Sequence, residues 1–250
     1  MIEAQISPTH KSAYLPMGTP VERKASRASD VDTLRLDAMG VHVTSASQLV
    51  KVLRQMGTRN ASGARTGPIF LHPGRYFFRD GLTVSSDYTD LIALSPGNTV
   101  FRREAAGTSA LVTLSGQGCR IQGVTFQDTA TTAQYAVKLS GLYSEAMACI
   151  FDDCWRAIHV TGNGCKVAEN LVKSSRDTTY SVYLEGNDPL VQCNRVLGAA
   201  AGATEIYAAD ASLRGVYVAN HCALTGAISY LAASLSVGDA TMNYATVTAR

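Results

Sequence analysis

Residues 157–172 read AIHVTGNGCKVAENLV, and this stretch decides the fold. Two short apolar segments, AIHVT and CKVAE, flank a glycine-containing corner. A second corner, at Asn170, leads into a third short segment, LV. Segments this short cannot bury an apolar face alone, so neighbouring parts of the sequence must supply the strands on which they stack.

The same pattern recurs along the chain. Segments similar to AIHVT occur at 136–140, 181–185, 205–209 and 227–231. Their first apolar residues are Val137, Ile158, Val182, Ile206 and Ile228, which are separated by 21, 24, 24 and 22 residues. Intervals of this size with two or three strands each predict an all-β fold, a parallel β-helix of about five or more coils.

A β-sandwich with evenly spaced strands is the alternative fold. Neighbouring strands of a sandwich are joined by hairpins, for which Asn-Gly turns are the strongest short signal. Such turns are nearly absent here, and GNG at 162–164 is the exception. The short β-branched strands and the regular intervals favour the solenoid.

One corner of each repeat carries a polar residue. This position falls at Asp153 in one repeat and at an asparagine in the next three, namely Asn170, Asn194 and Asn220. An asparagine side chain can bond to the backbone of its own turn and tolerates the left-handed conformation. Stacked asparagines can also bond to one another, so we expect these three to form a corner ladder.

Residues 45–57, SASQLVKVLRQMG, predict a helix at the start of the solenoid. Ser45 and Gln48 match a capping box, in which each side chain satisfies a free N–H group at the helix start. The apolar stripe is expected to comprise Leu49, Val50, Leu53 and Met56, with Gly57 at the helix end. We therefore divide the chain into an extended N-terminal arm (1–40), a β-helix with its capping helix (41–234) and a C-terminal strand or cap segment (235–250). The last segment is expected to pair with other copies of the chain.

The outward face of the AIHVT strand is a candidate interaction surface. Because Ile158 and Val160 point inward, His159 points outward. The equivalent positions of the repeats are Lys138, His159, Tyr183, Tyr207 and Ser229. Tyrosine supplies both ring area and a hydroxyl group, so this stripe suits contact with a sugar or a protein. The alternative is an ordinary solvated sheet face.

The segment GPIFLHPGRYFF (67–78) resembles an element, G-x-x-V-x-L-P-x-G-x-Y, that follows the capping helix in a known family. Gly67, Pro73, Gly74 and Tyr76 are in place. On these grounds residues 40–235 resemble the pectate-lyase-like right-handed β-helix superfamily, and more narrowly the tailspikes and appendages of tailed phages. Enzymatic and tailspike relatives often carry an acidic pair before the helix, where this chain has only Asp37. The superfamily hosts lyases, hydrolases, epimerases, adhesins and inert virion parts, so the resemblance specifies the fold better than the function.

This resemblance implies a structural component of a tailed-phage virion, either a capsid decoration or a tail spike or fibre-like appendage. We expect a homotrimer that attaches to other virion proteins through residues 1–30 and is assembled in the host cytoplasm. The N-terminus lacks the apolar core of a signal peptide. A surface glycan is a further expected partner.

The enzymatic alternative is a polysaccharide lyase or hydrolase, and its candidate residues are Asp152, Asp153, Glu169 and His159. Because adjacent strand residues point to opposite faces, a pair of carboxylates on one face requires Glu169 from the next coil. A lyase-like arrangement would instead use the charged residues Arg156, Lys173, Arg176 and Asp177. Proton transfer by His159 is disfavoured, because Glu185 is the only acid near a neighbouring outward position.

Composition excludes several other functions. The formal net charge of +2 gives no reason to expect nucleic-acid binding. No apolar stretch is long enough for a membrane span. The six cysteines form no CxxC pair, so we expect buried thiols of a reducing cytoplasm rather than disulfides or a zinc site. No cofactor or metal is expected.

Overall fold

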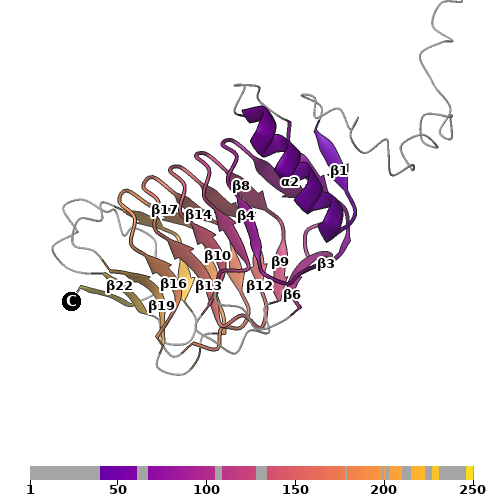
Figure 1. Cartoon of the computed structure of the whole chain (residues 1–250). Helices are drawn as coiled ribbons and strands as arrows, with labels where there is room; N and C mark the ends of the chain where they lie inside the picture. Colours follow the sequence, from indigo (N-terminus) through magenta and orange to yellow (C-terminus); the bar gives the residue numbers. More distant parts are fainter. Residues whose placement is uncertain are drawn as a thin grey trace, which may run out of the picture. The chain divides into compact units, whose positions relative to one another are not determined.

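The computed structural model describes residues 40–60, 67–104, 109–127, 134–177, 179–198, 200, 203–209, 215–222, 227–230 and 246–249. They belong to one compact unit, Leu36–Arg250. These residues form a parallel β-solenoid of about six turns, with a helix at its N-terminal end (Figure 1). The solenoid predicted from the repeat is confirmed. The expected arm, apart from Gly40, lies outside the described residues.

Each turn of the solenoid passes through three sheets in the same order, and every strand pairing is parallel (Figure 1). Sheet A contains β1 (Val41–Val43), β2 (Ile69–Leu71), β5 (Asp90–Ala93), β8 (Arg120–Gln122), β11 (Glu145–Met147), β14 (Lys166–Ala168), β17 (Leu190–Gln192) and β20 (Val216–Val218). Sheet B contains β3 (Gly74–Phe78), β6 (Thr99–Arg103), β9 (Thr125–Gln127), β12 (Ile150–Phe151), β15 (Leu171–Val172), β18 (Arg195–Val196) and β21 (His221–Cys222). Sheet C contains β4 (Leu82–Val84), β7 (Val112–Leu114), β10 (Tyr135–Leu139), β13 (Arg156–Val160), β16 (Tyr180–Leu184), β19 (Thr204–Ala208), β22 (Ala227–Tyr230) and β23 (Thr246–Ala249).

The register of sheet C matches the repeat in the sequence. The five marker residues, Val137, Ile158, Val182, Ile206 and Ile228, are consecutive Cα partners. A constant interval along the chain therefore corresponds to one full turn. Equivalent side chains of successive turns consequently stack in columns parallel to the solenoid axis.

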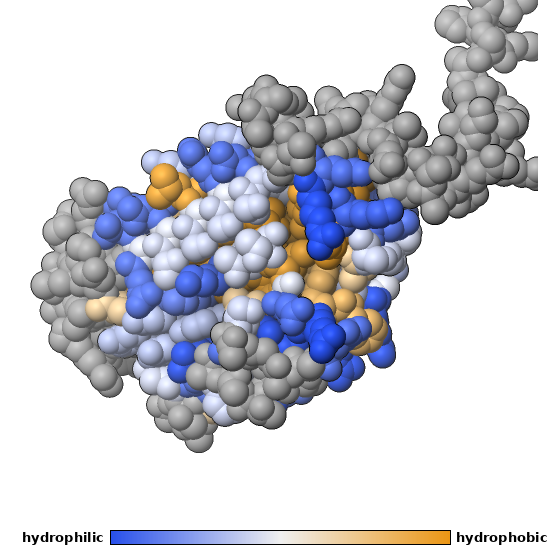
Figure 2. Space-filling view, in the orientation of Figure 1, coloured by the Kyte–Doolittle hydropathy of each residue, from blue (hydrophilic) through white to orange (hydrophobic). Residues whose placement is uncertain are grey.

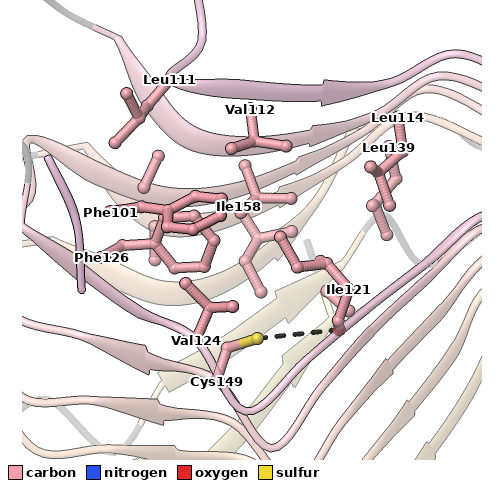
Figure 3. Packing of buried hydrophobic residues seen from close by; sticks show 14 of the residues in the cluster. Phe101, Leu111, Val112, Leu114, Ile121, Val124, Phe126, Leu139, Cys149 and Ile158 are labelled. Carbon is pink, nitrogen blue, oxygen red and sulfur yellow. Dashed lines mark hydrogen bonds between the residues drawn. The ribbon is translucent and has the colours of Figure 1, made fainter. Parts of the chain in front are cut away.

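Apolar columns fill the interior of the solenoid. Sheet B contributes an aromatic column of Tyr76, Phe101, Phe126 and Phe151, with ring centroids 5.3, 5.9 and 5.1 Å apart. All four side chains are fully buried, and Figure 3 shows Phe101 and Phe126 among the apolar residues packed from the other sheets. Rings of this size bury large apolar areas and make the N-terminal turns the most strongly packed.

Five of the six cysteines are buried in this interior, as expected, whereas Cys193 is exposed. The thiols behave as small apolar groups that donate weak hydrogen bonds to carbonyls of the preceding turn. Cys149 Sγ, for example, donates to the carbonyl of Ile121 at 3.7 Å (Figure 3). Burial raises the pKa of the Cys149 thiol to about 12. A thiol with this pKa stays protonated and unreactive at neutral pH.

The helix α2 (Ala46–Asn60) lies at the N-terminal end of the solenoid (Figure 1), and its buried side chains belong to the same hydrophobic core as those of the first turn. Its buried stripe is Leu49, Val52, Leu53 and Met56. Val50 is half-buried and packs against the core, as expected, and Val52 joins the stripe because residues 49, 52, 53 and 56 follow the helical period. The helix also continues three residues past Gly57. Within the described part of the chain α2 is the one helix, and it is not long and apolar enough to cross a membrane.

The N-terminal cap of α2 differs from a regular capping box. The N–H group of Gln48 donates to Ser45 Oγ at 3.3 Å, as expected. Gln48 Oε1, however, accepts from the N–H and hydroxyl groups of Thr44, at 2.9 and 3.0 Å, rather than from Ser45. The side chain therefore satisfies a donor one residue earlier than the sequence pattern predicts.

The three asparagines stack at the corner between sheets A and B and are almost completely buried. Asn194 Oδ1 accepts from the N–H group and the side-chain amide of Asn170, both at 3.0 Å. Asn220 Oδ1 accepts in the same way from Asn194, at 3.1 and 2.9 Å. Each amide also donates to a carbonyl of the preceding turn, as Asn194 does to Val167 at 2.9 Å.

Two details of the corner ladder differ from expectation. The asparagines bond to the neighbouring turn rather than to their own, and the residue that adopts positive φ is the one before each asparagine, for example Glu169 (φ 59°). Asp153 does not belong to the ladder. The residue at that level is Cys149, whose N–H donates to Asn170 Oδ1 at 3.0 Å.

At the C-terminal end, β23 extends sheet C by pairing in parallel with β22 of the same chain. The segment 235–250 thus contains the expected strand, within residues 246–249. Within the chain its pairing partner is β22, and pairing of its other edge with another copy stays a prediction. The remainder of this segment lies outside the described residues.

Candidate functional site

The outward stripe lies on sheet C. Lys138, His159, Tyr183, Tyr207 and Ser229 are consecutive Cα partners in β10, β13, β16, β19 and β22. The first four side chains are half-buried, and that of Ser229 lies outside the described side chains. Each half-buried side chain therefore packs against its neighbours in the column while exposing part of its surface to solvent.

A second outward column runs beside the first and was missed in the sequence. In β13 both Ala157 and Ile158 are fully buried, so that Arg156 and His159 both face outward. The strands β16 and β19 show the same order of one outward, two inward and one outward residue. Strict alternation would have turned Arg156 inward. The sequence did contain a signal for this second column. Tyr135 and Tyr180 are both large, and both lie at the same distance before the marker residue of their repeat.

Together the two columns form a continuous set of stacked rings, which we call the aromatic face. It comprises Tyr135, His159, Tyr180, Tyr183 and Tyr207. The His159 ring lies between Tyr135 (centroids 4.5 Å apart) and Tyr183 (5.1 Å), with interplanar angles of 27° and 16°. Tyr180 stacks on Tyr183 and on Tyr207 at 4.5 and 5.2 Å. In Figure 2 the surface over β10, β13, β16 and β19 has intermediate hydropathy, as rings with polar tips should have.

Arg156 contacts both tyrosines of the second column. Its guanidinium group lies 5.2 Å from the Tyr135 ring centroid and 5.0 Å from that of Tyr180, both within cation–π range. Arg156 Nε donates to Asp177 Oδ2 at 2.6 Å, and Trp155 Nε1 donates to the same oxygen at 2.8 Å. Burial alone would raise the pKa of Asp177, but hydrogen bonds from Thr179 and Arg156 outweigh it and lower this pKa. The carboxylate stays ionised and holds Arg156 in place.

Glu185 reaches the first column from the corner that follows β16. His159 Nε2 and Glu185 Oε2 are 2.7 Å apart, and the hydroxyl of Tyr183 hydrogen-bonds with the same carboxylate. Glu185, the one acid that the sequence placed near a neighbouring outward position, therefore does contact His159. Burial lowers the pKa of His159, and the hydrogen bond to Glu185 only partly opposes this. The hydrogen bonds to Glu185 lower its pKa despite desolvation, so a neutral imidazole donates to a carboxylate near pH 7.

This pair should make stability depend on pH. A histidine whose folded pKa lies below its unfolded value of about 6.5 contributes stability that is present above that value and lost as the pH falls through the folded pKa. The lowered pKa of Glu185 acts in the same direction at lower pH. We expect the melting temperature, measured by circular dichroism, to fall between about pH 7.5 and about pH 5. This fall in melting temperature should be smaller in His159→Gln than in the wild type. In the exposed-site control His42→Gln it should equal that of the wild type. An equal fall in His159→Gln and the wild type would contradict this.

The structure does not bring the candidate carboxylates of a hydrolase together. Asp152 and Asp153 lie at the corner between sheets B and C, where Asp153 is 3.3 Å from Arg176 Nε and Asp152 accepts from Ser174 Oγ at 3.4 Å. Glu169 lies at the other end of sheet B, beside the corner ladder. Leu171, which begins β15, pairs with Ile150, so Glu169 precedes its sheet B strand, whereas Asp152 and Asp153 follow theirs. One strand length thus separates the acids that the sequence placed in a common cleft.

A shallow pocket of about 350 Å³ adjoins the aromatic face. Strands β7, β10 and β13 and the segment before β7 supply its walls. Its lining residues are Ser109, Ala110, Thr113, Gln134, Tyr135, Lys138, Ser140 and His159. The volume is at the lower end of the roughly 300–1,000 Å³ typical of small-molecule sites.

His42 and His72 are a pair of potential metal ligands on neighbouring turns. His42 Nδ1 and His72 Nε2 are 3.0 Å apart at the N-terminal end of sheet A. Metal sites in proteins take three or four protein ligands. Within the described part of the chain, no group of three or more His, Cys, Asp or Glu side chains is arranged to hold a metal.

Comparison with known proteins does not identify a relative. No protein-family model matches the chain, and neither the curated proteins nor the solved structures yield a match. The geometry of the aromatic face and its pocket therefore carries the functional argument.

Proposed function

We propose that this chain is a structural component of a tailed-phage virion, a β-helical decoration or spike-like appendage, that binds a surface glycan without cleaving it. The observation that carries the binding role is the aromatic face. Five rings stack on one sheet, and the four that are half-buried expose part of their surface together with hydroxyl, carboxylate and ammonium groups.

The chemistry of the aromatic face suits a carbohydrate. A pyranose ring has an apolar C–H surface and a polar rim of hydroxyl groups. Tyrosine rings match this combination, because each offers an apolar body and a polar tip. Glu185 and Lys138 add an acceptor and a donor beside the rings. The rings are preorganised by mutual stacking and by Arg156, which reduces the entropy lost on binding.

The virion role rests on the resemblance stated above and on the architecture. A short solenoid with a capping helix suits a rigid appendage, since each turn stacks on its neighbour and the end needs covering. In this proposal residues 1–30 attach the protein to other virion proteins, and the chain assembles as a homotrimer. Deleting residues 1–30 should abolish attachment to particles, and light scattering should report a trimer. Unchanged attachment, or a monodisperse monomer, would contradict these two parts of the proposal.

Removing two rings should abolish glycan binding. We expect Tyr183→Ala combined with Tyr207→Ala to weaken binding to purified bacterial surface polysaccharide at least about tenfold, because each ring contributes up to about 1.5 kcal/mol beyond its area. Saturation-transfer NMR and calorimetry provide the measurement. Tyr143→Ala is the matched control, since this tyrosine is 61% exposed at a different corner. If the double variant binds as the wild type does, the aromatic face is not the binding surface.

A depolymerase is the second candidate, and the contact between His159 and Glu185 is the observation that favours it. Glycosidases commonly need two carboxylates flanking one bond. On the aromatic face, the second described carboxylate, Asp177, is 3% exposed and occupied by Arg156 and Trp155. Incubation with surface polysaccharide should therefore release neither reducing ends nor unsaturated uronates. Release that disappears in Glu185→Gln would establish the enzyme instead.

A further inference from the structure

The pocket beside the aromatic face differs in chemistry from the rest of sheet C. Two stacked rings, Tyr135 and His159, form one side of it. Hydroxyl and amide groups form much of the remainder, from Ser109, Thr113, Gln134 and Ser140. This combination of a ring platform with convergent polar groups is typical of sites that hold one small polar ring.

Lys138 gives the pocket a positive charge. It is the Cα partner of Thr113 on one side and of His159 on the other, so it lies at the centre of the lining. None of the described lining residues is an acid. Among the described residues, Lys138 forms no ion pair within 4.0 Å.

Two described acids beside the aromatic face already have partners. Asp177 is bound by Arg156 and Trp155, and Glu185 by His159 and Tyr183. The charges of Lys138 and Arg156 both act on His159, where they favour the neutral imidazole. The Arg156–Asp177 pair is neutral overall, and the Lys138 ammonium, which forms no ion pair within 4.0 Å among the described residues, is the group that an entering anion can approach without displacing a bound carboxylate.

We propose that this pocket binds a carboxylated sugar residue of the hexuronate or sialic-acid type. The pyranose ring lies against the outer edges of the Tyr135 and His159 rings, and its carboxylate accepts from the Lys138 ammonium. The hydroxyl and amide groups of the lining bond to the remaining sugar hydroxyls. This inference rests on the proposed function and adds the class of sugar that the aromatic face selects.

The test compares matched acidic and neutral ligands by NMR titration: 3′-sialyllactose with lactose, and methyl glucuronide with methyl glucoside. Wild-type protein should bind each acidic ligand about tenfold or more tightly than its neutral counterpart, as a charge-assisted hydrogen bond allows. Lys138→Met should remove the preference for the acidic ligand, and Lys138→Arg should retain it. Lys173→Met, an exposed lysine at the end of β15, is the control and should have no effect. Inorganic phosphate serves as a competitor that distinguishes charge alone from a sugar.

Each outcome separates this inference from the proposed function. Equal affinity for acidic and neutral ligands, or a preference that survives Lys138→Met, overturns the inference. If the Tyr183→Ala and Tyr207→Ala double variant still loses glycan binding in that case, the proposed function stands. Full displacement of 3′-sialyllactose by equimolar phosphate also overturns the inference, because a sugar ring would then contribute nothing. Absence of binding to any glycan overturns both.

Discussion

Asn194→Leu is expected to lower the free energy of unfolding by about 3–5 kcal/mol, because a buried donor or acceptor left without a partner costs about 1–3 kcal/mol. Leucine has a similar volume and fills the corner. It cannot accept from the N–H and amide groups of Asn170, nor donate to the carbonyl of Val167. All three groups lie inside the solenoid, where water cannot replace the lost bonds.

Urea denaturation followed by circular dichroism measures this change. Asn163→Ala provides the matched control, because Asn163 is an exposed corner asparagine that accepts a single bond from the N–H of Asn187 at 2.9 Å. Its loss should cost less than about 1 kcal/mol. Similar destabilisation by both variants would show that the ladder contributes no more than an ordinary surface hydrogen bond.

Gly162→Ala is expected to destabilise the protein by about 3 kcal/mol or more, because overpacking a closely packed site forces backbone shifts. A Cβ atom at this position would lie 2.3 Å from the carbonyl oxygen of Gly141 in the preceding turn. The same close approach recurs at Gly141 and Gly186, where a Cβ would lie 1.9 and 2.1 Å from the preceding glycine's carbonyl oxygen. Glycine is needed here for space, since Gly162 does not have positive φ.

Gly97→Ala is the control for this substitution. Gly97 has φ of 88°, which disfavours alanine, but no atom lies within 4 Å of the position that its Cβ would take. The cost should be limited to about 1–2 kcal/mol of backbone strain. Thermal melts of the two variants would contradict the steric explanation if Gly97→Ala proved the more damaging.

The repeat intervals predicted the fold because the geometry of a coil fixes the number of residues in each turn. One coil has a nearly constant path length, so equivalent residues recur at 21–24 positions and become Cα partners. The marker residues and the outward stripe could therefore be assigned in register without coordinates. The same reasoning located the corner asparagines, whose amide groups suit a buried stacked position.

The second column of the aromatic face escaped prediction because the strands of sheet C depart from a period of two. Two consecutive inward residues, such as Ala157 and Ile158, turn Arg156 to the outside. Period-two reasoning cannot detect this local irregularity. The acids of the enzymatic hypothesis failed to meet for a related reason: the short strand of sheet B separates Glu169 from Asp152 and Asp153 at the opposite corner.

By itself, the sequence determined the stacked solenoid, the register of its turns and the residues that form its columns, because these follow from chain length per turn and from burial of apolar side chains. The tertiary structure alone decided which groups meet across turns. His159 and Glu185 are 26 residues apart, and Arg156 and Asp177 are 21 apart. Their contacts depend on side-chain direction at corners and irregular strands, where neither periodicity nor local propensity specifies the conformation. Side-chain direction also places Lys138 beside Tyr135 and His159, in a pocket that no sequence motif predicted.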